Sequence, residues 1–220
     1  MIVSITIIKI YDNKYPHREV NLLLNSKLNT AEKTIVIDPG HGGYDVGAVG
    51  SLGNQEKKLT LEISLKLGSI LQEKGYNVVY TRENDEVSWP SEPKEDLAAR
   101  AAISNYEKAT IFLSIHLNKF NEKSVTGTET YYNEASSQGK VLADLIQKQI
   151  IEDLKTTDRG IKKGNFLVLE KVKAPAILVE LGYISNESDE KNLSNSDYQN
   201  KISLSMTKAI DNYFKINPQN

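Results

Sequence analysis

Two histidines and a glutamate stand where polar side chains are unusual. His41 follows the short β-branched run Thr34–Asp38 (TIVID) directly, in the segment DPGHGG, and His116 lies inside the apolar run TIFLSIHL. Glu180 interrupts a third apolar run, AILVELG. Burying an unpaired carboxylate costs several kcal/mol, so Glu180 must pair with a cation, ligate a metal or stay protonated. A single buried histidine is more often a hydrogen-bonded structural residue than a ligand. The combination of His41, His116 and Glu180 therefore indicates a site more strongly than any one of them.

Glu56 is a second glutamate in an informative place. Residues Glu56–Lys74 are predicted to form a helix that Gly75 ends, because apolar residues recur on one stripe: Leu59, Ile63, Leu67, Ile70 and Leu71. Glu56 lies on the same stripe and should point along the core-facing side. An acidic residue in the first turn is also favoured by the helix dipole, so Glu56 alone does not identify a site.

The predicted elements bring these four side chains to one edge of a sheet. His41 lies just beyond the carboxyl end of its strand, His116 and Glu180 lie near the carboxyl ends of theirs, and Glu56 opens the helix that follows the first strand. Ligand sites in open α/β sheets form beyond the carboxyl ends of the strands. Two histidines and a carboxylate are a standard catalytic zinc set, with water in the fourth position. A further carboxylate would act as general base on that water.

Strands alternate with helices along the chain, which predicts an α/β layered fold with a mainly parallel sheet. Strands are expected over Thr34–Asp38, Asn77–Arg82, Thr110–Leu117, Gly127–Tyr132, Asn165–Leu169 and Ala176–Gly182. Helices are expected over Glu56–Lys74, Asp96–Lys108, Val141–Leu154 and Tyr198–Phe214. Several strands are continuous apolar runs, as expected when both faces of the sheet are covered.

Composition limits the possible functions. The chain has 220 residues, enough for one substantial domain, with 39% hydrophobic and 25% charged residues. A formal net charge of −2 gives no indication of nucleic-acid binding, which usually needs a clustered basic surface. Cysteine is absent, so any metal must be held by His, Asp or Glu.

Residues 1–33 are expected to be a lead-in to a catalytic domain over residues 34–216. Residues 1–10 (MIVSITIIKI) are apolar but too short to span a bilayer, and they lack the basic region and cleavage site of a complete signal peptide. Two interpretations stay open: the remnant of a trimmed export segment, or an edge strand or irregular terminus. His17 lies in the irregular part of this lead-in and is assigned no role.

Two other segments contain residues with candidate functions. The glycine-rich segment Gly40–Gly50 (GHGGYDVGAVG) fails the dinucleotide pattern at Asp45 and has no Lys-Ser or Lys-Thr after Gly47 for a phosphate loop. Its glycines are expected to let the backbone turn sharply and to admit a bulky substrate. Trp89, in the predicted surface loop Glu83–Glu95, is either a substrate contact or a packing anchor.

Together these motifs resemble the zinc N-acetylmuramoyl-L-alanine amidases of the Amidase_3 type. The resemblance covers about residues 34–216 and rests on IDPGHGGYDVGAVG (Ile37–Gly50), Glu56 before an apolar helix, YTR (Tyr80–Arg82), FLSIHLN (Phe112–Asn118), GTETYY (Gly127–Tyr132) and PAILVELGYISNESDE (Pro175–Glu190). It implies a three-layer α/β/α sandwich around a roughly six-stranded, mostly parallel sheet.

The resemblance also implies roles for individual residues. His41, Glu56 and His116 match the family's Zn²⁺ ligands, and Glu180 matches its catalytic glutamate. Two further matches, Arg100 and Asn118, are expected to support the site or the substrate. The substrate would be peptidoglycan, cut between the N-acetylmuramoyl lactyl group and L-alanine, and the protein would be exported to the cell wall or spore envelope.

The compact single domain is most similar to the CwlD-type amidases of spore cortex, although phage endolysins use the same catalytic domain. Some family members need an activating protein partner, and the sequence leaves this open here. Two other functions stay open at this point: a zinc peptidase that cuts within the stem peptide, and a noncatalytic glycan-binding module.

Overall fold

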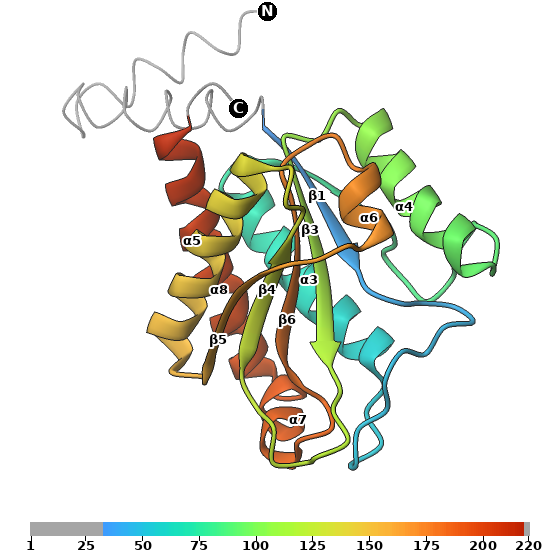
Figure 1. Ribbon diagram of the computed structural model, residues 1–220, viewed down its shortest axis with the longest axis vertical. Coiled ribbons are helices and arrows are strands. Elements are labelled where there is room, and N and C mark those ends of the chain that lie inside the picture. Colours follow the sequence, from blue (N-terminus) through green and yellow to red (C-terminus); the bar gives the residue numbers. More distant parts are fainter. Residues whose placement is uncertain (1–32, 218–220) are drawn as a thin grey trace, which may run out of the picture.

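The computed structural model describes residues 33–217, which fold around one six-stranded sheet with strand order β2-β1-β3-β6-β4-β5 (Figure 1). The strands are β1 (Thr34–Pro39), β2 (Asn77–Tyr80), β3 (Ile111–Asn118), β4 (Thr128–Tyr132), β5 (Asp158–Lys163) and β6 (Ala176–Tyr183). The helices are α3 (Glu56–Glu73), α4 (Pro93–Tyr106), α5 (Ser137–Leu154), α6 (Leu167–Lys171), α7 (Glu187–Leu193) and α8 (Ser196–Ile216).

Helices cover both faces of the sheet (Figure 1). Helices α3, α5 and α8 bury their apolar stripes in the larger core, which includes Leu67, Ile146 and Ile210. Helices α4 and α6 pack on the other face, where Ala101 and Val168 belong to a smaller cluster. The predicted three-layer α/β/α sandwich is therefore confirmed.

The sheet changes direction at one pairing. Strands β2, β1, β3 and β6 are parallel, and β4 and β5 are parallel to each other, but β4 pairs with β6 antiparallel. The amino ends of β4 and β5 therefore meet the carboxyl end of β6. One edge of the sheet thus gathers the carboxyl ends of four strands and the starts of two more, which places Glu129 of β4 opposite Glu180 of β6.

Capping side chains decide where several helices begin. The helix predicted from Asp96 starts earlier, at Pro93, because the Glu92 carboxylate accepts hydrogen bonds from the N–H groups of Lys94 and Glu95. The expected surface loop Glu83–Glu95 therefore ends three residues sooner. Helices α5, α7 and α8 are capped in the same way by Ser136, Asn186 and Asn195.

One predicted strand is wrong. The run Asn165–Leu169 (NFLVL) was expected to be a strand, but Leu167–Lys171 forms the short helix α6, with Phe166 at its N-cap. Short apolar runs fit either element, and here Val168 and Leu169 pack onto the smaller core cluster. The sixth strand is instead β5, Asp158–Lys163 (DRGIKK). Its polar residues suit a half-exposed edge strand, so no apolar alternation marks it.

Some of the expectations from the sequence concern residues that the structure does not describe. His17, the apolar run 1–10 and almost all of the lead-in 1–33 lie outside the described residues. Within residues 33–217, no helix combines the length and apolar character that a membrane crossing requires.

The packing of α5 yields a stability prediction. Ile146 is completely buried between α5 and the sheet, so Ile146→Ala should lower the free energy of unfolding by about 2–5 kcal/mol through lost burial and a residual cavity. Val141→Ala, on the exposed side of the same helix, should change it by less than about 0.5 kcal/mol. Urea unfolding followed by circular dichroism measures both, and equal losses would contradict this packing.

Candidate metal centre and catalytic site

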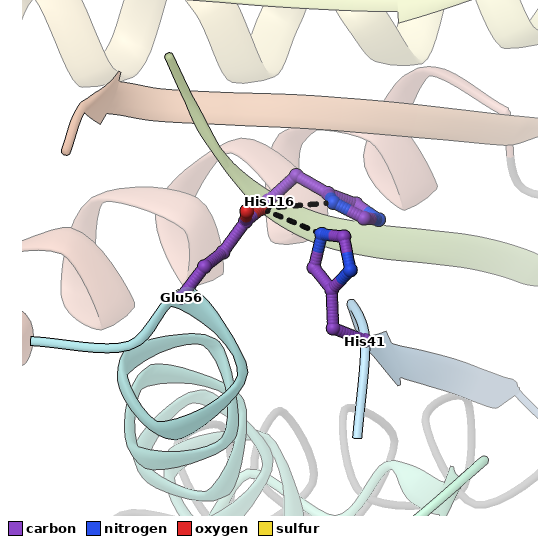
Figure 2. A group of neighbouring side chains, drawn as sticks. All are labelled: His41, Glu56 and His116. Atoms are coloured by element: carbon purple, nitrogen blue, oxygen red, sulfur yellow. Dashed lines mark hydrogen bonds and ion pairs between the residues drawn. The ribbon is translucent and has the colours of Figure 1, made fainter. Parts of the chain in front are cut away.

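Three side chains from three elements meet at the carboxyl edge of the sheet (Figure 2). His41 follows β1, Glu56 is the first residue of α3, and His116 lies near the end of β3. Glu56 Oε1 is 3.0 Å from His41 Nε2 and 3.1 Å from His116 Nδ1. One ligand atom from each residue lies within 4.8 Å of the other two, so the group could hold a metal ion.

The spacing of these donors fits a tetrahedral cation. Ligand atoms about 2.0–2.1 Å from a tetrahedral zinc are about 3.3 Å apart, close to the two separations found here. The other nitrogen of His41, Nδ1, is 2.7 Å from Asp45 Oδ2. A carboxylate behind a histidine commonly fixes the ring orientation of a metal ligand. Asp45 was not singled out as a partner from the sequence, although it lies in the glycine-rich motif.

The local electrostatics favour a cation. Burial alone would lower the pKa of His41, but hydrogen bonds to Glu56 and Asp45 and their charges outweigh it and raise this pKa to about 9. Burial would raise the pKa of Glu56, but the two histidines hold it far below its usual range. The carboxylate is therefore ionised, and a metal ion binding here would displace protons from the rings.

Glu56 is held on both of its oxygens. Oε1 accepts a hydrogen bond of 2.9 Å from the Leu117 N–H, and Oε2 accepts one of 2.9 Å from the Ala48 N–H. The Glu56 backbone N–H in turn donates to the Ala48 carbonyl. The glutamate is buried, as its place on the apolar stripe predicted.

The glycine-rich segment makes room for these side chains. A Cβ at Gly40 would lie 2.4 Å from the His116 ring, and one at Gly47 would lie 2.8 Å from Glu56 Oε2. Gly47 also has a φ of 66°, and His41 itself has a φ of 63°, which is uncommon for a residue with a side chain. The sharp turns predicted for this segment are present, while its contact with substrate stays a prediction.

Glu180 lies beside this group without joining it. It is the Cα partner of His116 across the β3–β6 pairing. Its Oε2 is buried and finds no hydrogen-bond partner among the described residues. Burial raises the pKa of Glu180 to about 7, with Glu56 and Glu129 adding to the rise and His116 and His41 opposing it. A carboxylate with such a pKa can both accept and release a proton near neutral pH.

Arg100 supports the turn that carries His41. Its guanidinium donates to Asp38 Oδ1 at 2.9 Å, to the Pro39 carbonyl at 3.1 Å and to the His41 carbonyl at 2.9 Å. It also pairs with Asp96. Burial would raise the pKa of Asp38, but the charge of Arg100 together with hydrogen bonds from Thr81 and Ser114 outweighs it and lowers this pKa. Sequence reasoning missed Asp38, although it ends β1 next to the motif histidine.

Trp89 packs against this network. Its ring lies under the Arg100 guanidinium, 4.9 Å from ring centroid to carbon, a contact that fits the packing anchor of its two expected roles and leaves the substrate contact a prediction. Asn118, the last residue of β3, donates from Nδ2 to Glu129 Oε1 at 2.5 Å. Glu129 was not identified from the sequence, because only the antiparallel register of β4 brings it here.

A cavity of about 510 Å³ opens beside the metal group on the α4 and α6 side. Four residues of the site contribute to its wall: His41, Arg100, His116 and Glu180. Apolar side chains complete the wall, among them Leu97, Phe166, Val168 and Leu178. The cavity therefore has room for a substrate that reaches both the histidines and Glu180.

Comparisons with known proteins agree with this geometry. Residues 35–212 match the family model described as N-acetylmuramoyl-L-alanine amidase (Amidase_3). The germination-specific N-acetylmuramoyl-L-alanine amidase of Bacillus subtilis is 35% identical over 190 residues, which cover 83% of this chain and 80% of that protein.

Solved structures give the same result. The CwlD amidase of Clostridioides difficile, solved in complex with the GerS lipoprotein, superposes with a TM-score of 0.80 at 33% identity over 84% of this chain and 100% of that one. The catalytic domain of CwlV from Bacillus (Paenibacillus) polymyxa var. colistinus gives 0.76 at 38% identity over 83% and 98%. The family model spans most of the described residues, and this chain belongs to the N-acetylmuramoyl-L-alanine amidase family.

Proposed function

We propose that this protein is a zinc-dependent hydrolase that cuts the amide bond between the N-acetylmuramoyl lactyl group and the L-alanine of the peptidoglycan stem peptide. The observation that carries the proposal is the meeting of His41, Glu56 and His116, with the unpartnered carboxylate of Glu180 beside them. Membership of the amidase family supports the choice of bond.

In this proposal the three-residue group holds the metal. His41 would bind through Nε2 and His116 through Nδ1, while the Glu56 carboxylate completes the set, because these atoms face one another. Bound zinc would supply a Lewis acid for activating water and polarising the amide carbonyl. Asp45 holds the His41 ring, which keeps Nε2 directed at the site.

Glu180 is proposed as the general base and then the general acid. It takes a proton from the attacking water while the new C–O bond forms, and it gives that proton to the alanine nitrogen as the C–N bond breaks. Its burial, free oxygen and raised pKa support both steps. The products are a lactyl carboxylate on the glycan and a free amino group on the stem peptide.

Arg100 and Asn118 are proposed to support the site. Arg100 lines the cavity and fixes the His41 backbone, and Asn118 lies two residues beyond His116 at the end of β3. We further propose that the protein is exported and acts in the cell wall or spore envelope. The relatives named as germination-specific amidase and CwlD support a role in spore cortex.

A protein partner is also proposed as an activator, because the CwlD structure is a complex with the GerS lipoprotein. Activity assays on this protein therefore need both the isolated chain and the chain with an extract of its own envelope proteins. Release seen only with the extract would support an activating partner.

Metal content is the first prediction. Purified, zinc-reconstituted protein should hold about one zinc per chain, and the double variant His41→Ala, His116→Ala should hold almost none, because two of three protein ligands are gone. Elemental analysis measures both. His17→Ala, which changes the remaining histidine, should keep its zinc. Normal zinc in the double variant would reject this ligand set.

The role of Glu180 is the second prediction. Glu180→Gln should keep zinc and the unfolding midpoint while activity falls about 10²–10⁴-fold, since proton transfer contributes rate enhancements of that order. Glu170→Gln, at an exposed position of α6, serves as the matched control and should retain activity. Loss of zinc in Glu180→Gln would instead make Glu180 a ligand.

The bond that is cut gives the third prediction. Sacculi digested with the protein are labelled at free amines, hydrolysed and analysed for the labelled amino acid. L-alanine should dominate, reducing sugars should not rise, and a zinc chelator should stop the release. Labelled D-alanine or diaminopimelate would indicate a peptidase, and new reducing ends a glycosidase. Pull-down on sacculi without any released product, with and without envelope extract, would favour a binding module.

A further inference from the structure

Glu129 is a second buried carboxylate near the proposed general base. It lies on β4 and is 2% exposed. Its Oε1 accepts hydrogen bonds from Asn118 Nδ2 at 2.5 Å, from the Tyr131 hydroxyl at 3.0 Å and from the Tyr183 hydroxyl at 3.4 Å. Its Oε2 pairs with Lys162 of β5. Four donors from four places in the fold therefore converge on one carboxylate.

Placing a carboxylate at position 129 costs free energy, which its partners must offset. It is the Cα partner of Glu180 across the antiparallel β4–β6 pairing, so the two side chains share one face of the sheet. Directly opposed like charges destabilise a sheet, and a buried carboxylate needs a cation or several donors. Lys162 supplies the cation.

A neighbouring ion pair near the same two strands provides a comparison, because it is exposed to solvent. Glu134, just after β4, pairs with Lys163 of β5, but both side chains are more than half exposed. Within the described residues, no hydrogen bond or ion pair joins that pair to the site residues named above. Glu129, in contrast, connects β5 to the end of β3.

Asn118 is the link between Glu129 and the reaction. Its Oδ1 accepts from the Lys119 N–H at 2.8 Å, and its Nδ2 donates to Glu129, so both ends of the amide are fixed. The residue lies two positions beyond His116, where the register of the β3–β6 pairing shifts. The Asn118 backbone carbonyl accepts from the Ile184 N–H at 2.8 Å, and the contacts to Glu129 and Lys119 set the direction of the side-chain amide.

We propose that Glu129, paired with Lys162, is a positioning residue for the amidase reaction and acts by fixing the side chain of Asn118 at the end of β3. The inference rests on the proposed function. Neither Glu129 nor Asn118 belongs to the cavity wall, but Glu129 contacts Asn118 directly, and the proposal is that its effect on the reaction passes through that contact.

The test is a set of kinetic measurements on zinc-loaded protein with solubilised peptidoglycan. Glu129→Ala should lower kcat about tenfold with KM changed less than about twofold, because an interaction used mainly in the transition state is lost. Glu129→Gln keeps an acceptor oxygen for Asn118 and should recover a large part of kcat. It also replaces Glu129→Ala if that variant does not fold.

Coupling to Asn118 distinguishes positioning from general stability. In an Asn118→Ala background, Glu129→Ala should change kcat less than about twofold, since the group through which it acts is already missing. Glu134→Ala, the matched exposed partner of Lys163, should leave kcat unchanged. Wild-type kcat in folded Glu129→Ala, full multiplication of the two effects, or a loss explained by missing zinc would overturn the proposal.

A second readout does not depend on activity. The side-chain amide protons of Asn118 should exchange slowly in the wild-type protein by NMR and rapidly in Glu129→Ala. Rapid exchange in the wild type would overturn the positioning role. If the wild type cuts no peptidoglycan under any condition, the proposed function fails, while this contact is still decided by the exchange measurement.

Discussion

The Glu56 carboxylate connects the parts of this fold that the site needs. One oxygen lies between histidine nitrogens from β1 and β3, and both oxygens accept backbone N–H groups from segments far apart in the sequence. Since these contacts require an ionised carboxylate at the first turn of α3, the helix, the glycine-rich segment and the end of β3 must adopt one mutual arrangement. The three residues that could hold a metal therefore also contribute to holding these parts of the fold together.

The buried carboxylates near Glu56 differ in the partners that offset their burial. Next to it, Glu180 keeps one oxygen without a partner and a pKa raised by burial, whereas Asp38 and Glu129 are buried with cations and several donors. Burial alone therefore does not decide how a carboxylate behaves here, because the partners of the three differ. Glu180, whose Oε2 finds no hydrogen-bond partner among the described residues, is the one proposed to exchange a proton.

Much of the architecture was predictable because it depends on local patterns. The stripe that includes Glu56 and Leu67 predicted α3 and its buried first residue, and apolar runs predicted β1, β3 and β6. Strand β5 was missed because its exposed, lysine-rich sequence carries no alternation, and α6 was mistaken for a strand because five apolar-rich residues fit both elements. Glu129 could not be identified from local pattern, since its neighbours depend on a long-range antiparallel register.

The ends of the described chain lie together and away from the metal group. Lys33 Nζ lies 5.4 Å from the centre of the Phe214 ring, so the start of β1 and the end of α8 are neighbours. From there, β1 runs its six residues, about 20 Å, before the chain reaches His41. A tag or fused module joined at either end of the described residues would therefore attach at the edge of the sheet opposite His41, Glu56 and His116.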